Sequence, residues 1–325
     1  MGRASCRRPS IVDWTYSIVV IRGIGASSSD RNMTSFKLGM GYIHVPNLAC
    51  GGSRGVKCEQ KSFLFAEDMP ANLQSVMSSL IAAEQPLHRV MTQRHRSLVV
   101  GGAEVAPFAY PFVARIHNSW GGVGFCGGSL IDRYWVLTAA HCVVDRLARY
   151  VAVGIHRHSI QYLGVEEHPC AELIMVSEII LHPMFAGSWS VSSDVALLKL
   201  SQSVSCWSAT PLRLDGGEFW PLTTPSAIPI RNATVLGWGI ADDGGQAAFL
   251  KATWQELYTS TECHDILGDI FYYDHGWYVT DGDGCAGVYG TTTIRGFCAG
   301  DSGGPLLVRD PTTGTYYQVG IVSAV

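Results

Sequence analysis

Three short segments of the chain carry a histidine, an aspartate and a serine, the residue types needed for nucleophilic catalysis by a hydroxyl group. His141 lies in Leu-Thr-Ala-Ala-His-Cys at residues 137–142, Asp194 in Ser-Asp-Val-Ala-Leu-Leu at 193–198, and Ser302 in Gly-Asp-Ser-Gly-Gly-Pro at 300–305. A serine hydroxyl is a poor nucleophile at neutral pH unless a neighbouring imidazole takes its proton. A carboxylate can hold that imidazole in the required tautomer. The segments therefore predict attack of Ser302 on a carbonyl carbon.

The order of these segments is more specific than any one of them. A histidine beside a cysteine, or an aspartate at the head of an apolar strand, is common in purely structural roles. The run around Ser302 is specific by itself, and Gly-Trp-Gly at 237–239 lies between the second and third segments. Together they resemble the chymotrypsin/trypsin family of serine endopeptidases over Val99 to Val325. The order His, Asp, Ser also disfavours an α/β-hydrolase esterase, whose triad runs Ser, Asp, His.

The resemblance implies an all-β fold of two six-stranded antiparallel barrels, with the active site between them. His141 and Asp194 are expected from the first barrel and Ser302 from the second. His141 is expected to act first as general base and then as general acid. The backbone N–H groups of Gly300 and Ser302 are expected to form the oxyanion hole, where one donor contributes about 3–4 kcal/mol to transition-state stabilisation.

The family also predicts synthesis as a zymogen. Val-Val-Gly-Gly at residues 99–102 matches the mature N-terminus of relatives. The α-amino group of Val99, once freed, is expected to pair with Asp301 and so to order the oxyanion hole and the specificity pocket. Leu98 stands where most relatives have Arg or Lys, and Arg96 lies two residues earlier. Either a non-tryptic protease cuts after Leu98, or cleavage after Arg96 is followed by trimming.

The residues of the specificity pocket disfavour basic substrates. Gly296 or Phe297 is expected at the base of the pocket, and neither is acidic. Ser323 matches a serine that contacts the catalytic aspartate, and Val325 stands where many relatives have a pocket-wall glycine. We therefore expect cleavage after small or medium apolar side chains.

Ten cysteines without a CxxC pair favour disulfides in an oxidising compartment over a zinc or thioredoxin-like site. The resemblance pairs Cys126 with Cys142 and Cys263 with Cys285, each bridge stabilising by about 3 kcal/mol on a chain-entropy model. A third family bridge is replaced at both positions, by Ala233 and Val308. Six cysteines remain. Cys298 is left without its family partner, a bridge between Cys170 and Cys206 is open, and Cys6, Cys50 and Cys58 are unassigned.

The 325-residue chain changes in character near residue 98. Residues 1–98 are interpreted as a signal and pro-segment, largely disordered, with an imperfect signal peptide at Ile11–Ile21 and one helix over 71–84. Residues 99–325 are interpreted as the protease domain, with short apolar runs between turn signals. Strands are predicted at Phe112–Ile116, Trp135–Ala139, Tyr150–Val153, Glu178–Leu181, Val195–Leu200, Thr234–Trp238, Pro305–Val308 and Gln318–Val322.

The composition limits the classes of partner that can be expected. The formal net charge is −4 and no dense basic stretch is present, so no nucleic-acid partner is expected. No run reaches the roughly 20 apolar residues of a membrane-spanning helix. No cofactor or metal is expected, because Ile155 and His156 stand where calcium-binding relatives place a glutamate. The expected protein is a secreted monomer that acts on protein or peptide substrates after cleavage by an activating protease.

The chain stops at Val325, about 30 residues before the end expected from the family. The second barrel is therefore expected to be truncated and open at one edge, with Cys298 left without its family partner. The leading hypothesis is a serine endopeptidase working through an acyl-enzyme. The alternative is a truncated or inactive protease-like protein that acts as a binding module.

Overall fold

The structure is a computed structural model of the whole chain. It describes residues 16–27, 33–38, 41–46, 102–144, 148–158, 171–185, 193–206, 208–220, 230–240, 245–265, 283–289, 296 and 298–323. Within these residues the chain is almost entirely β, as the turn-separated apolar runs predict. The helix predicted over 71–84 lies outside the described residues.

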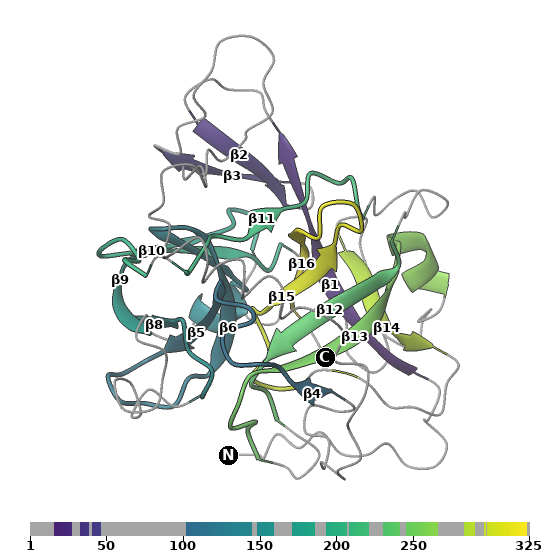
Figure 1. Ribbon diagram of the computed structural model, residues 1–325. Helices are drawn as coiled ribbons and strands as arrows, with labels where there is room; N and C mark the ends of the chain where they lie inside the picture. The colour runs from purple at the N-terminus through teal and green to yellow at the C-terminus, as the bar shows by residue number, and fades with distance from the viewer. Residues whose placement is uncertain are drawn as a thin grey trace, which may run out of the picture.

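Six strands between Val113 and Leu200 form a closed antiparallel barrel in the order β10-β7-β6-β5-β8-β9 (Figure 1). Short, mostly buried strands suit this architecture, because closure leaves no strand edge unpaired. The strands are β5 (Val113–His117), β6 (Cys126–Asp132), β7 (Trp135–Thr138), β8 (Tyr150–Val153), β9 (Glu172–Leu181) and β10 (Ala196–Leu200). The four-residue helix α2 (His141–Val144) follows β7 after two buried alanines.

A second group of six strands also forms a ring, and its sixth member comes from the N-terminal end of the chain. Antiparallel pairings connect β16, β15, β12, β13, β14 and β1 in turn, and β1 pairs again with β16. The strands are β1 (Tyr16–Ser27), β12 (Asn232–Gly237), β13 (Lys251–Tyr258), β14 (Asp283–Tyr289), β15 (Pro305–Arg309) and β16 (Tyr316–Val322). Figure 1 shows β1 in purple among the green and yellow strands.

The register of β1 shows how it completes the ring. Ile21 pairs with Gly284 of β14 on one side and with Val322 of β16 on the other. The strand continues beyond the ring and pairs with β2 (Met33–Leu38), which pairs in turn with β3 (Gly41–Pro46). These three strands are not predicted from the sequence, and the run interpreted as a signal peptide ends inside β1. The expectation of an open edge in the second barrel is wrong because β1 occupies that edge.

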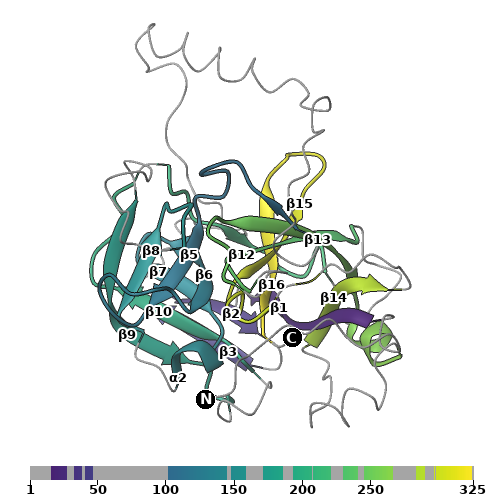
Figure 2. The ribbon, with the colours of Figure 1, turned by 90° about the horizontal axis from the view of Figure 1, so that it is seen from below.

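Two short strands attach to the second ring. β4 (Ala103–Glu104) pairs with β13, and β11 (Arg213–Leu214) runs parallel to β16 (Figure 1). Figure 2 shows the ring from below, with β1 in purple beside β14. One large apolar cluster fills the first barrel and extends to Trp238 and Ile321 of the second, while a smaller cluster lies around Leu257. Ala233 and Val308 both belong to this smaller cluster, so apolar packing stands where the family has a bridge.

Among the described residues no helix is long and apolar enough to cross a bilayer.

Both disulfides implied by the resemblance are present. Cys126 is bonded to Cys142, with a Cα–Cα distance of 6.2 Å, and Cys263 is bonded to Cys285 at 5.5 Å. Cys298 is also disulfide-bonded, so the expectation that it lacks a partner is wrong. Cys206 is disulfide-bonded as well, but Cys170, its suggested partner, lies outside the described residues.

Candidate active site

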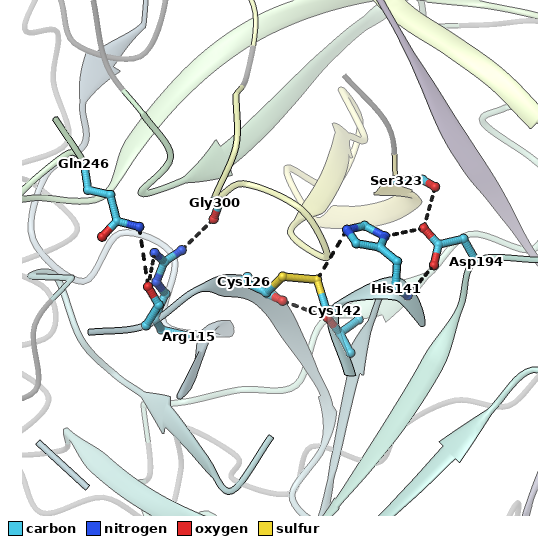
Figure 3. Close-up of a disulfide and its surroundings, with 11 residues drawn as sticks. Arg115, Cys126, His141, Cys142, Asp194, Gln246, Gly300 and Ser323 are labelled. Atoms are coloured by element: carbon cyan, nitrogen blue, oxygen red, sulfur yellow. Dashed lines mark hydrogen bonds and ion pairs between the residues drawn. A yellow bond between two sulfur atoms is a disulfide. The ribbon is translucent and has the colours of Figure 1, made fainter. Parts of the chain in front are cut away.

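His141 and Asp194 are held together by two hydrogen bonds. Asp194 accepts the backbone N–H of His141 on Oδ1 at 2.7 Å, and its Oδ2 lies 2.6 Å from Nδ1 of the imidazole (Figure 3). The carboxylate side chain is 1% exposed, whereas the imidazole is 26% exposed. Asp194 therefore fixes the orientation of a ring whose other nitrogen remains accessible. Burial strengthens this contact because little water competes for the carboxylate.

Ser323 makes the third contact with this carboxylate. Its hydroxyl donates to Oδ2 of Asp194 at 2.6 Å, which is the contact predicted from the sequence. Ser323 directly follows β16, and the N–H and C=O of Val322 both bond to the Ser302 loop, at Gly304 and Gly303 respectively. The end of β16 thus connects the aspartate to the loop that carries the serine.

The loop around Ser302 packs against the segment that leads to His141. The carbonyl of Ser302 accepts the N–H of Gly127 at 2.8 Å. A Cβ at Gly303 would overlap Oγ1 of Thr138 and lie 3.2 Å from the nitrogen of Ala139, so only glycine fits there. This close approach explains why glycines follow the serine: they let the second barrel contact the first just before His141.

The hydroxyl of Ser302 has no hydrogen bond to the imidazole in this structure. Nε2 of His141 instead lies 3.7 Å from the disulfide sulfur of Cys142. Ser302 is partly exposed. Hydrogen bonds of a catalytic pair are often long or misaligned without substrate, so the gap does not rule out a shared function.

Two backbone N–H groups of the loop that carries Ser302 make no hydrogen bond to another described residue. They belong to Gly300 and to Ser302 itself. Gly300 has φ of 103°, a conformation that side chains rarely adopt. The preceding carbonyl, of Ala299, accepts the N–H of Ile240 at 3.0 Å. Because C=O and N–H of a trans peptide point in opposite directions, this bond turns the N–H of Gly300 away from Ile240.

Asp301 is fully buried beneath this loop. Its carboxylate accepts the N–H of Gly239 at 2.6 Å and that of Cys298 at 2.9 Å. Burial raises the pKa of Asp301, whereas these two hydrogen bonds and the charge of Arg115 lower it. A Cβ at Gly237 or Gly239 would overlap the carboxylate. The Gly-Trp-Gly motif is therefore the surface on which Asp301 rests.

Substitution of Gly239 by alanine is expected to destabilise the fold by about 1–3 kcal/mol, because an overpacked buried site forces its neighbours to move. Thermal unfolding should show Tm lower by several degrees. Gly216→Ala is the matched control, because Gly216 is exposed and a Cβ there meets no heavy atom within 4 Å. Equal Tm values for the two variants would contradict this packing account.

Several residues predicted for the site are not described. Val99, Phe297 and Val325 lie outside the described residues, and Gly296 lies inside them, two residues before Cys298. In the described part of the chain, one cluster has metal-ligating residue types: Cys126, His141 and Cys142. The two cysteines of this cluster form a disulfide and so cannot supply thiolate ligands.

Arg115 is a site residue that the sequence motifs do not predict. It is fully buried in β5 and bonds to the carbonyl of Gly300. The available signal was its position within an apolar run, Phe112–Ile116, because a fully buried arginine is unusual unless it is paired.

Two β-barrels with a histidine–aspartate pair on the first and a Gly-Asp-Ser-Gly-Gly-Pro loop on the second define a protein of the chymotrypsin-type class. Comparison with known families agrees with the geometry: residues 99–325 match the family Trypsin. The chain belongs to this family of serine proteases.

Similar proteins include chymotrypsin-like elastase family member 1 of Rattus norvegicus, 35% identical over 211 residues that cover 64% of this chain and 72% of the relative. The protein of the same name from Canis lupus familiaris is 34% identical over 232 residues, covering 70% and 81%. Coagulation factor XII of Cavia porcellus is 33% identical over 246 residues, covering 72% of this chain and 36% of the relative.

Proposed function

We propose that this serine protease is a secreted endopeptidase that cleaves peptide bonds through an acyl-enzyme formed on Ser302. The observation that carries the proposal is the double hydrogen bond between buried Asp194 and His141. This contact places a proton on Nδ1 and leaves Nε2 as the acceptor, which is the tautomer a general base needs.

In the proposed reaction, Nε2 of His141 takes the Ser302 proton as the hydroxyl attacks the substrate carbonyl. The carbonyl oxygen gains negative charge and is bound by the N–H groups of Gly300 and Ser302. His141 then gives the proton to the leaving amine, and water hydrolyses the acyl-enzyme with the same base. Asp194 stays ionised throughout and offsets the charge on the imidazolium.

The proposal includes activation by cleavage. A protease of unassigned specificity frees the α-amino group of Val99, which pairs with Asp301. The buried Asp301 carboxylate supports this role, because an anion in the interior is favourable only when it is paired and hydrogen-bonded.

The proposed substrates are proteins or peptides with small or medium apolar side chains before the cut. The absence of an acidic residue at Gly296 and Phe297 supports this preference. A library of peptides that vary at this position tests it, and preferred cleavage after Arg or Lys would rule it out. Secretion is supported by the disulfides.

The hydrolase is tested by labelling with a fluorophosphonate probe, which reacts with an activated serine. Chain cleaved before Val99 should be labelled at Ser302, and Ser302→Ala should not be labelled. Ser205→Ala is a matched control that removes a serine outside the site and should be labelled like the wild type. If the correctly folded, cleaved chain is not labelled, the proposed function is wrong.

A second candidate is a binding module without activity. The missing hydrogen bond between Ser302 and His141 favours it, because Nε2 of His141 lies instead beside the sulfur of Cys142. The same labelling experiment separates the two, because a binding module of this fold would leave Ser302 unreactive.

A further inference from the structure

Arg115 is a buried cation for which the catalytic steps above have no role. It lies in the middle of β5, where every residue is buried, and it has no exposed surface of its own. Burial lowers the pKa of its guanidinium to about 10, so the group is still charged at neutral pH. Burial of a charge raises the free energy of the folded state unless partners stabilise that charge.

The partners of Arg115 are carbonyl groups of two loops. Nη1 donates to the carbonyl of Gly300 at 2.6 Å (Figure 3). Nη2 donates to the carbonyl of Gly124 at 2.7 Å. The guanidinium also lies over the ring of Trp238, 5.6 Å from its centre. The planar fork of arginine suits two separate acceptors, which the ammonium of lysine cannot reach together.

Gly124 provides the space for this side chain. A Cβ at Gly124 would overlap Cγ of Arg115 and lie 2.8 Å from Cδ. The glycine and the arginine therefore fit as a pair: one lacks a side chain where the other passes.

Arg115 acts on Asp301 without a direct ion pair in the described structure. The two charges attract each other through the protein interior, which raises the pKa of the arginine and lowers that of the aspartate relative to burial alone. The carbonyl of Gly300, which Arg115 holds, belongs to the peptide group that leads into Asp301. Arg115 thus contacts the loop at the point between the oxyanion-hole glycine and the buried carboxylate.

Both peptide groups around Gly300 are consequently anchored. Ile240 holds the carbonyl before Gly300 at 3.0 Å, and Arg115 holds the carbonyl of Gly300 itself at 2.6 Å. With both planes fixed, the glycine keeps its left-handed conformation and its N–H stays free for an oxyanion. In the uncleaved chain the nitrogen of Val99 is in a peptide bond and carries no charge, so Arg115 supplies the positive charge that acts on Asp301.

We propose that Arg115 is a positioning residue for the oxyanion hole, and that it holds Gly300 and Asp301 in place before the chain is cleaved. The inference rests on the proposed hydrolysis by Ser302 and concerns its regulation. It predicts a precursor with basal reactivity, in which cleavage before Val99 adds to an arrangement that already exists.

The test measures the rate constant for fluorophosphonate labelling of Ser302 in the uncleaved full chain, with its intact mass confirmed. The wild-type precursor should be labelled measurably, and Arg115→Met should be labelled about 10- to 100-fold more slowly, because a misplaced oxyanion donor is lost to the transition state. Arg115→Lys, which keeps the charge but not the fork, should fall between them. Labelling is measured well below the Tm of each variant, where the folded fraction is close to one, so that a loss of stability alone leaves the rate constant unchanged.

Arg133→Met is the matched control. Arg133 also donates to a backbone carbonyl, that of Val204 at 2.7 Å, but it is exposed and remote from the loop. It should be labelled at the wild-type rate. If Arg115→Met does not fold, Gly124→Ala takes its place: it retains the arginine but crowds it, and it should also slow labelling.

Two results overturn the inference and leave the proposed function standing. One is labelling of the cleaved chain but not of the uncleaved wild type. The other is a wild-type rate constant in Arg115→Met, or in both Arg115→Lys and Gly124→Ala. Absence of labelling in the cleaved and the uncleaved wild type alike instead overturns the proposed function.

Discussion

Replacement of Asp194 by asparagine is expected to lower kcat by about 10⁴-fold while the fold stays intact, a magnitude taken from serine proteases of this family. Asp194 accepts three hydrogen bonds, from the backbone N–H and Nδ1 of His141 and from the hydroxyl of Ser323. An asparagine has one acceptor oxygen and an NH₂ group that only donates. If the oxygen keeps the backbone N–H, the NH₂ faces Nδ1, and the imidazole must move its proton to Nε2. It can then no longer accept the proton of Ser302.

The control for this prediction is Ser323→Ala, which removes one donor but leaves the tautomer of His141 unchanged. It should lower kcat by less than about tenfold, in line with the loss of one hydrogen bond of about 1–1.5 kcal/mol. Steady-state hydrolysis of an apolar peptide substrate measures both variants, and thermal unfolding checks that both are folded. A fall of less than tenfold in Asp194→Asn would show that His141 does not act as the base.

Removal of residues 1–46 is expected to prevent the second barrel from closing. The deletion takes away β1, which pairs with β14 over Tyr16–Arg22 and with β16 over Ile21–Gly23. The backbone groups of two strands lose their partners together, at a cost of about 1–3 kcal/mol for each one that stays buried. That loss rivals the 5–15 kcal/mol stability of a typical domain. Purification should yield aggregate, because exposed strand edges pair with other chains.

A deletion of residues 1–15 is the control, because it removes a similar terminus but keeps β1. It should remain monomeric in size-exclusion chromatography. A finer comparison uses Ile21→Pro and Ser35→Pro. Ile21 has partner strands on both sides, so the lost N–H breaks a bond of the ring whichever way it points. Ser35 lies in β2, outside the ring, and its substitution should lower Tm much less.

The sequence predicts most of the first barrel, because its strands are short apolar runs between turn residues. β6 is missed because it begins with Cys-Gly-Gly-Ser, and only the end of β9 is predicted. The observed strands at Trp135–Thr138 and Tyr150–Val153 follow the predicted runs closely. The contact of Ser323 with Asp194 and both implied disulfides follow from the resemblance, because homologous positions keep the same spatial neighbours.

The remaining features depend on contacts that no local pattern reveals. β1 has apolar residues, but nothing in residues 16–27 indicates pairing with strands near the other end of the chain. Arg115 appears in the sequence only as a charge inside an apolar run, and its role depends on the space left by Gly124. Cys298 similarly finds a partner that the family pattern does not supply.

The position of β1 also has a consequence for how the protein folds. Ile21 leaves the ribosome about 300 residues before its partner Val322. Closing so large a loop is entropically unfavourable and slow compared with forming local hairpins. The first barrel can form during synthesis, but the second must wait until β16 has been made. During that interval β1 has no partner strand from the second ring. We therefore expect chaperones to bind it during biosynthesis.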